Sequence, residues 1–278
     1  KTGHQTWFVE NKTMFGRPGM YQDTETGKDF PDNDIRFHFF AKAALECCRR
    51  NDFKPDIVHL HDWQASLAAI FLRTIFKSDP FFSKSAVVLT IHNLAYQGRF
   101  PAERYRLLEL PDNLFIPTAP LEFYGTVNLL KGAISFADRI TTVSRRYAEE
   151  IQTVEFGCGL EGVLSERRAH LTGILNGADY GEWSPSRDRR IPYHYHTANL
   201  SGKRKNKIEL MAFAGLPYRE KTPLLGMITR LVDQKGLDII VEAAAQLMQF
   251  DLQLIVLGVG ESKYHQALTL LQKTYPDK

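Results

Sequence analysis

A group of polar residues stands at the end of an apolar run in the stretch "DIVHLHDWQ" (56–64). The apolar residues of the run predict a β-strand. Two histidines and an aspartate, His59, His61 and Asp62, lie at the end of that strand. Such side chains can form a metal site or a catalytic site, or can only mark the point where a strand becomes a loop. All three interpretations are open at this point.

Polar residues or glycines also follow the other predicted strands. In chain order these residues are His61 and Asp62, His92 and Asn93, Ser144, Asn176 and Gly177, Arg230, and Gly258 and Gly260. Open parallel sheets bind their ligands beyond the carboxyl ends of the strands. One polar residue at a strand end is ordinary, but several on one edge indicate the wall of a polar cleft.

A zinc site made of His59, His61 and His92 is the main alternative. His59 and His61 are two residues apart on a predicted strand and therefore share one face. The sequence has no second matched pair of ligands, as zinc sites usually have. We therefore predict no metal site, and we interpret His59 as a core or subsite residue.

The stretch "TRLVDQKGLDIIVEA" (229–243) indicates an anion site. Arg230 ends a predicted strand, and Lys235 and Gly236 stand just before a predicted helix. A helix N-terminus offers free N–H groups and the positive end of a dipole, both of which suit a phosphate. Arginine and lysine could hold a diphosphate there and stabilise it as a leaving group without a metal. The alternative is two surface cations beside a loop.

The elements that must position these residues alternate between strand and helix. Such alternation predicts parallel βαβ units with helices on both faces of a sheet. We predict strands over 7–11, 56–60, 86–93, 139–144, 173–177, 223–231 and 252–258, and helices over 32–48, 65–76, 122–138, 145–152, 237–248 and 263–275.

An irregular segment, 180–203, interrupts this alternation. Two βα series on either side of it predict an α/β fold of two Rossmann-like domains facing a cleft. The expected boundaries are an N-terminal domain at 1–172, a crossing region at 173–222 and a C-terminal domain at 223–278. The second series has only two strands, so we expect that domain to be incomplete.

Composition excludes several classes of partner. The formal charge of the 278 residues is +3, too small to indicate nucleic acid as the main partner. Three cysteines, two of them adjacent, indicate a reducing compartment rather than a disulfide framework. No apolar stretch is long enough to cross a membrane, and the first residues show no export signal.

The ordered set of motifs resembles one family, the bacterial and plant glycogen (starch) synthases. These are ADP-glucose-dependent retaining transferases of glycosyltransferase family 5, with the GT-B fold. The matching stretches are "DNDIRFHFFAKAALE", "PDIVHLHDWQASLAA", "TIHNLAYQGRFP", "EFYGTVNLLKGAISFADRITTVS", "GCGLEGVL", "GILNGADYGEWSP", "KRKNKIEL", "GMITRLVDQKGLDII" and "LIVLGVGE". They cover nearly the whole chain in the family's order.

The resemblance implies roles for residues at the predicted cleft. It places Asp62 on the sugar and acceptor side, His92 near the transferred glucose, and Arg230 and Lys235 on the donor's diphosphate. These four are the predicted catalytic residues. Predicted to bind substrate are His61, Asn93, Gln97, Gly98, Asn176, Gly258 and Gly260.

The implied reaction moves glucose from ADP-glucose to the 4-OH at the non-reducing end of an α-1,4-glucan, with retention of configuration. The expected partners are ADP-glucose and the glucan, with no metal or other cofactor, no nucleic acid and no membrane. The expected location is the bacterial cytoplasm or, in a plant, the plastid stroma. The alternatives are a non-catalytic glucan-binding module and a UDP-sugar-dependent GT-B transferase.

The sequence also departs from the family pattern. The family's N-terminal Lys-Thr-Gly-Gly loop and its C-terminal acidic donor motif are absent, so we expect a partial chain lacking both ends. The opening "KTGHQ" shares three letters with that loop, which we interpret as coincidence. Arg145, Arg146 and Cys158 are local departures within the matching stretches.

Overall fold

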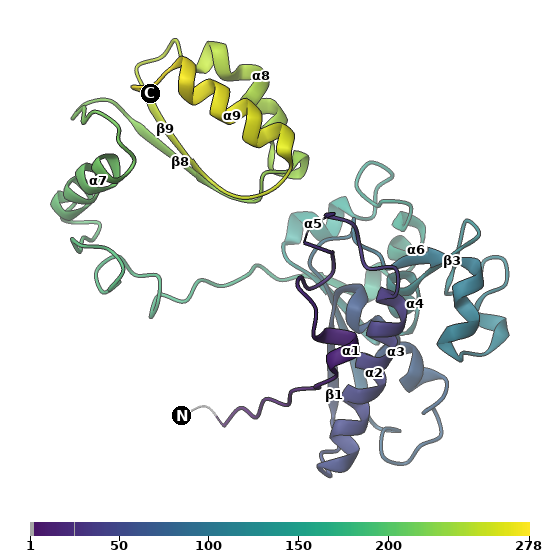
Figure 1. Ribbon diagram of the computed structural model, residues 1–278. Coiled ribbons are helices and arrows are strands. Elements are labelled where there is room, and N and C mark those ends of the chain that lie inside the picture. The colour runs from purple at the N-terminus through teal and green to yellow at the C-terminus, as the bar shows by residue number, and fades with distance from the viewer. Residues whose placement is uncertain (1–2, 25) are drawn as a thin grey trace. The chain divides into compact units, whose positions relative to one another are not determined.

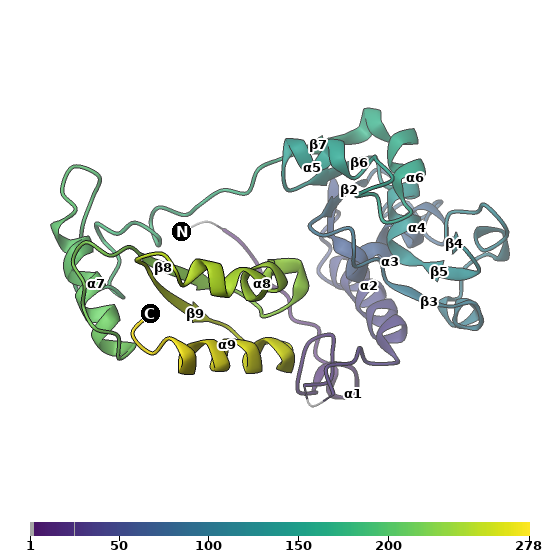
Figure 2. The same ribbon diagram turned by 90° about the horizontal axis from the view of Figure 1, so that it is seen from above.

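The structure, a computed structural model, describes residues 3–24 and 26–278. Residues 1 and 2, which begin the "KTGHQ" stretch, lie outside the described residues. The chain divides into two units, Lys1–Gly177 and Ala178–Lys278, and Figure 1 and Figure 2 show their elements from two directions. The division falls within the crossing region that the sequence predicts.

A four-stranded parallel sheet forms the centre of the first unit. Its strands, in their order across the sheet, are β1 (Ile57–His61), β2 (Ala86–Ile91), β6 (Arg139–Thr142) and β7 (Leu171–Gly173). Leu60 lies beside Leu89, and these leucines point to one face of the sheet. His61 lies beside Thr90 in the next row, and these residues point to the other face. The alternation therefore places His61 and Thr90 on the face opposite Leu60 and Leu89.

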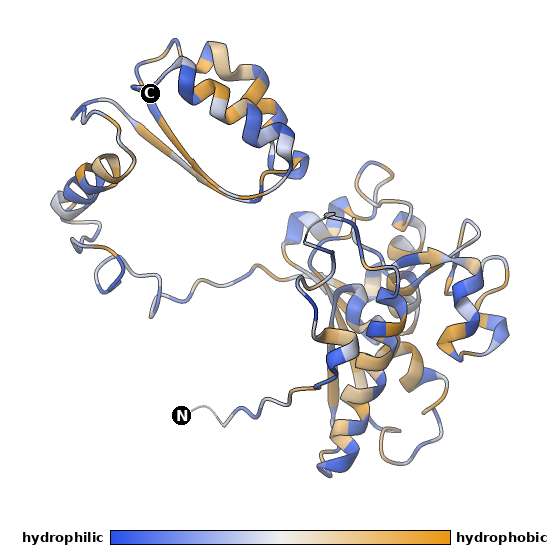
Figure 3. Ribbon diagram, in the orientation of Figure 1, coloured by the Kyte–Doolittle hydropathy of each residue, from blue (hydrophilic) through white to orange (hydrophobic). Residues whose placement is uncertain are grey.

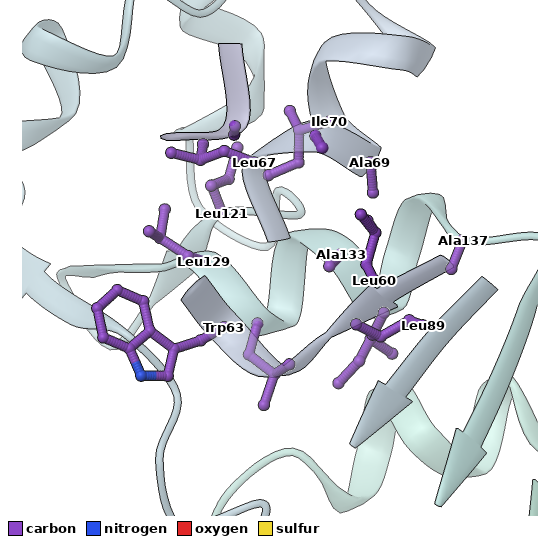
Figure 4. Packing of buried hydrophobic residues seen from close by; sticks show 14 of the residues in the cluster. Leu60, Trp63, Leu67, Ala69, Ile70, Leu89, Leu121, Leu129, Ala133 and Ala137 are labelled. Atoms are coloured by element: carbon purple, nitrogen blue, oxygen red, sulfur yellow. The ribbon is translucent and has the colours of Figure 1, made fainter. Parts of the chain in front are cut away.

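Helix α3, which directly follows β1, is the most buried helix of the first unit. The helices of this unit are α1 (Lys12–Phe15), α2 (Asn33–Arg50), α3 (Asp62–Arg73), α4 (Leu129–Phe136), α5 (Arg145–Glu150) and α6 (Glu161–Glu166). Figure 4 shows Leu67 and Ile70 of α3 packed among residues of α4 and of the sheet. Full burial of such a side chain stabilises the fold by about 1.5–3 kcal/mol. This core holds the carboxyl end of β1, and therefore Asp62, in a fixed place.

A small antiparallel sheet lies between β2 and α4 in the chain. Its strands are β3 (Arg99–Pro101), β5 (Thr126–Asn128) and β4 (Glu122–Phe123), accompanied by the 3₁₀ helices η1 (Ala102–Leu108) and η2 (Asp112–Leu114), while η3 (Arg168–His170) precedes β7. The helix predicted over 122–138 is therefore wrong in its first half. Tyr124 and Gly125 both have positive φ, 48° and 79°, which is the two-residue hairpin turn that matches the twist of its strands.

Two further strand predictions need correction. Residues 7–11 form no strand: Trp7 makes an edge contact with Phe53, with ring centroids 5.7 Å apart, and Phe8 is exposed. The apolar residues of this stretch pack singly because the segment pairs with no neighbouring strand. The strand predicted over 173–177 ends at Gly173 as part of β7, so Asn176 lies in the loop beyond it.

The second unit is built on two parallel strands. Its elements are α7 (Ser201–Phe213), β8 (Leu224–Ile228), the 3₁₀ turn η4 (Asp233–Lys235), α8 (Leu237–Leu247), β9 (Gln253–Leu257) and α9 (Ser262–Thr274). Leu225 lies beside Leu254 in register, and Figure 3 shows the apolar character of both strands. A small core of Leu231, Leu237 and Tyr264 joins the loop after β8 to α8 and α9.

The α/β class is confirmed, because helices connect parallel strands in each unit.

The basic stretch "SGKRKNK" (201–207) is the first half of α7, and Lys207 donates from Nζ to the carbonyl of Arg219 at 3.0 Å. Over residues 3–24 and 26–278, none of the helices has the length and apolar character needed to cross a membrane.

We expect the side chain of His38 to make the stability of the first unit depend on pH. Burial lowers the pKa of His38, and its Nε2 is buried with no hydrogen-bond partner among the described residues. The unfolded chain therefore binds more protons than the folded one once the pH falls below about 6.5. We expect the free energy of unfolding to decrease as the pH is lowered from 7.5 to 5.5.

Urea unfolding at several pH values, followed by circular dichroism, measures this effect. The variant His38→Leu should show a flatter pH profile, because it has no imidazole to protonate. Equal slopes in the parent and the variant would exclude His38 as the source.

Candidate functional site

Asp62 lies at the junction of β1 and α3, in a strained backbone conformation. Its φ is +56°, a left-handed conformation that aspartate adopts more readily than most residues. Its Oδ1 accepts a hydrogen bond from the backbone N–H of His92 at 2.7 Å. The carboxylate therefore connects the ends of β1 and β2. Residues held in such conformations occur often at functional sites.

The imidazole of His61 contacts the imidazole of His92. Nδ1 of His61 and Nε2 of His92 are 2.9 Å apart and share a hydrogen bond, and the two rings stack with centroids 5.2 Å apart. Partial desolvation of the ring is the largest cause that lowers the pKa of His61, followed by the neighbouring His59 and His92. The two predicted site residues are thus brought together as the sequence suggests.

The three histidines considered as a zinc site do gather at this edge of the sheet. His59 stacks on His61, with ring centroids 4.4 Å apart, but its Nε2 bonds to Oγ1 of Thr90 at 2.7 Å. Thr90 in turn bonds to Oγ1 of Thr141 at 2.6 Å. One ring nitrogen of each histidine is thus engaged with another histidine or with threonine. Among the described residues, no group of three or more His, Cys, Asp or Glu is arranged to hold a metal ion.

The other two polar residues predicted in the first unit differ in their surroundings. Asn93 follows His92, and its Oδ1 accepts a hydrogen bond from the backbone N–H of Ala95 at 3.1 Å, which shapes the loop after β2. Asn176 is exposed in the loop beyond β7. The substrate contacts of both residues stay predictions.

Gln97 and Gly98 make contacts within the first unit that hold the loop after β2. Gln97 is 5% exposed, accepts from Nδ2 of Asn128 at 2.7 Å and donates to the carbonyl of Cys158 at 3.0 Å. Gly98 has φ +62°, and a Cβ at this position would lie 2.4 Å from the ring of Trp63. These residues therefore fix the loop after β2 against α3 and α4. A direct contact with substrate stays a prediction for both.

Arg230 and Lys235 lie on the loop between β8 and α8 in the second unit. Arg230 follows the end of β8, and Lys235 is the last residue of η4. Gly236, with φ +73°, is the N-cap of the 11-residue helix α8. Both cationic side chains are exposed and have no ion-pair or hydrogen-bond partner in the described part of the chain. Their charges are thus available to an anion at the start of α8.

Asp233, the acidic residue of the loop that carries Lys235, is bonded by side chains of α9. Asp233 accepts hydrogen bonds at Oδ1 from Nζ of Lys263, at 2.7 Å, and from the hydroxyl of Tyr264. These bonds, with that to Lys263 the larger cause, lower the pKa of Asp233. Because α9 engages this carboxylate, Asp233 does not pair with Lys235.

Gly258 and Gly260 allow two loops of the second unit to lie against each other. A Cβ on Gly258 would lie 2.0 Å from the carbonyl oxygen of Thr229, and one on Gly260 would lie 2.3 Å from that of Leu231. Real Cβ atoms do not approach so closely, so side chains here would displace the loop that carries Arg230. The observed role of both glycines is this close packing, and ligand contact stays a prediction.

Two residues that the sequence did not indicate support the edge of the first sheet. Asn128 is fully buried and caps α4, accepting from the backbone N–H of Lys131 at 2.9 Å while it donates to Gln97. The hydroxyl of Tyr147 accepts from the backbone N–H of Leu94 at 3.0 Å. Asparagine before a helix is a known capping signal, but nothing in the sequence near Tyr147 points to Leu94.

The comparisons with known proteins identify the fold. The structure is similar to the catalytic domain of starch synthase IV from Arabidopsis thaliana bound to ADP and acarbose, with a TM-score of 0.83 and 32% sequence identity over 91% of this chain and 52% of that chain. This similarity confirms the GT-B class of α/β protein that the sequence predicts.

The family that the residues suggested is also confirmed. The starch synthase catalytic domain family matches residues 1–166, and the chain belongs to this family. Glycogen synthase 2 from Geobacter metallireducens is 48% identical over 255 residues, which are 92% of this chain and 52% of the relative. Glycogen synthase from Thermotoga petrophila is 46% identical over 274 residues, 99% of this chain and 55% of the relative. The chain spans about half the length of the curated relatives it matches.

Proposed function

We propose that this protein transfers glucose from ADP-glucose to the 4-OH at the non-reducing end of an α-1,4-glucan, with retention of configuration. The observation that carries the proposal is a pair of exposed cations at the start of α8, Arg230 and Lys235, which have no partner among the described residues. The relatives named glycogen synthase and the starch synthase structure with ADP and acarbose support the same reaction.

On the donor side, the departing ADP gains negative charge as the bond to glucose breaks. Lys235 supplies a point charge and Arg230 a planar fork of N–H donors that fits two phosphate oxygens. Backbone N–H groups at the start of α8 add a positive dipole end. Stabilisation that grows with the developing charge lowers the barrier for transfer. We propose that these groups act without a metal or other cofactor.

On the acceptor side, Asp62 and His92 supply a carboxylate and an imidazole at one edge of the sheet. A carboxylate near the anomeric carbon can stabilise the oxocarbenium-like character of a glycosyl-transfer transition state. The imidazole can hydrogen-bond a hydroxyl of the transferred glucose.

We propose the bacterial cytoplasm as the compartment, in keeping with the bacterial relatives, and the plastid stroma if the protein is from a plant.

Incorporation of labelled glucose into glycogen tests the proposal. The chain is incubated with glycogen and either ADP-glucose or UDP-glucose, with heat-treated protein as the control. Incorporation from ADP-glucose above the control supports the proposed function, and preference for UDP-glucose would contradict the donor assignment. Retention of the chain on immobilised glycogen without incorporation would instead support a glucan-binding module.

Replacing Asp62 separates the charge of its carboxylate from its hydrogen bond. Asp62→Asn keeps an oxygen that can accept from the N–H of His92 and tolerates the left-handed backbone, but it removes the charge. We expect both Asp62→Asn and Asp62→Ala to lower kcat by roughly 10²-fold or more, the scale of lost electrostatic stabilisation, with little change in the KM for ADP-glucose. Initial rates at varied ADP-glucose give both constants. A kcat of Asp62→Asn near that of the parent would assign Asp62 a positioning role only.

A further inference from the structure

His92 is held at two separate points. Oδ1 of Asp62 accepts from its backbone N–H at 2.7 Å, and Nδ1 of His61 lies 2.9 Å from its Nε2. The first contact fixes the backbone at the end of β2, but leaves the imidazole free to rotate about its side-chain bonds. The second contact limits that rotation. The other ring nitrogen, Nδ1 of His92, has no hydrogen-bond partner in the part of the chain that the structure describes.

We propose that His61 is a positioning residue for His92, one that fixes both the orientation and the tautomer of its imidazole. The inference rests on the proposed function for its consequence, which is that Nδ1 of His92 is presented to a sugar hydroxyl. It changes the role predicted for His61 from direct substrate binding to action through His92.

The hydrogen bond couples the tautomers of the two rings, because they share one proton. If His61 donates from Nδ1, neutral His92 carries its proton on Nδ1 and can donate to a ligand. If His92 donates from Nε2, its Nδ1 has a lone pair and can only accept. In either arrangement the hydrogen bond determines what Nδ1 of His92 can do. A second-site group that sets the tautomer of a functional histidine is a general device in proteins.

The surroundings of His61 favour this role over one in the core. His61 is exposed at the end of β1, and its backbone neighbour Leu60 is the residue that enters the core. The lowered pKa of His61 keeps its ring neutral near pH 7, the state in which a tautomer is defined. Loss of its imidazole should therefore change His92 without unfolding the unit.

Two variants test whether Nδ1 of His61 is the atom that orients His92. The side-chain amide of asparagine can place a nitrogen or oxygen close to the position of Nδ1, whereas that of glutamine reaches the position of Nε2. His61→Asn should therefore keep the bond to His92, and His61→Gln should lose it. His170→Gln is the matched control, because His170 bonds through Nδ1 to Arg139, which begins β6, two strands away from β1 in the sheet.

The first readout is the pair of ¹⁵N shifts of the His92 imidazole, measured in this chain at pH 7.5. We expect one dominant tautomer in the parent, in His61→Asn and in His170→Gln, and a mixture of tautomers in His61→Gln. Amide spectra and thermal unfolding establish that each variant is folded. Unchanged His92 shifts in a folded His61→Gln variant would overturn the proposal.

The second readout is turnover with ADP-glucose. We expect kcat to fall about tenfold or more in His61→Gln and to recover to within about threefold of the parent in His61→Asn, with a similar KM for ADP-glucose in all three. Equal losses in both variants would also overturn the proposal. If the parent chain shows no turnover, the proposed function is at fault, and the shifts of His92 still decide the role of His61.

Discussion

Replacing Lys235 or Arg230 with alanine should lower kcat/KM for ADP-glucose by roughly 10²–10³-fold each, the scale of losing one donor to a developing negative charge. Both side chains are exposed at the start of α8 and lack an internal partner among the described residues, so their loss should cost little stability. Steady-state rates with ADP-glucose measure the loss in kcat/KM. Calorimetry with ADP measures how much of that loss is weaker binding of the nucleotide.

A matched control removes a positive charge at the other end of the same strand. Lys221 is exposed and precedes β8, whereas Arg230 follows it. Lys221→Ala should leave kcat/KM within about threefold of the parent, because an exposed charge far from the phosphates is screened by salt. Arg230→Lys should give an intermediate loss, since it keeps the charge but not the fork. Parent-like rates in Lys235→Ala and Arg230→Ala would remove both residues from the donor site.

Replacing Gly98 with alanine should lower the free energy of unfolding of the first unit by about 2–5 kcal/mol. Two costs add: a left-handed φ of +62° disfavours a residue with a Cβ, and that Cβ would lie 2.4 Å from the ring of Trp63. Trp63 cannot easily move, because it packs edge-on against Phe37 and Phe100. Urea unfolding followed by tryptophan fluorescence measures the loss, since Trp63 is buried while Trp7 and Trp183 are exposed.

Gly125 is the matched control for Gly98. Its φ of +79° is also left-handed, but a Cβ there would meet no atom within 4 Å. Gly125→Ala should therefore cost only the backbone strain, about 1–2 kcal/mol. If the two variants lose equal stability, the contact with Trp63 contributes nothing and the packing argument fails.

The sequence predicted the parallel strands well because their signal is local. The strands β2, β6, β8 and β9 lie within the predicted ranges, and β1 extends one residue beyond its predicted range. The failures occurred where a local pattern was overruled by partners distant in sequence. Residues 7–11 have strand-like composition but pair with no strand. Residues 122–128 have a helix-like pattern of apolar residues but form a hairpin that turns at Tyr124 and Gly125.

The candidate site shows the same limit. Types and spacing placed His61, Asp62 and His92 at strand ends, and the pairing of β1 with β2 brings those ends together. The sequence also indicated the cations before α8. It did not show that Gln97 is buried in bonds to Asn128 and Cys158, because those partners lie 31 and 61 residues further along the chain.

The sequence by itself therefore determined the α/β class, the family and the residue types at each strand end, all of which depend on short-range patterns and ordered motifs. Only the tertiary structure decided which atoms meet. The register of β1 and β2 sets Nδ1 of His61 against Nε2 of His92, and Lys263 of α9 engages the carboxylate of Asp233. Hydrogen bonds depend on a few tenths of an ångström and on direction, and these are fixed by packing between segments far apart in the chain.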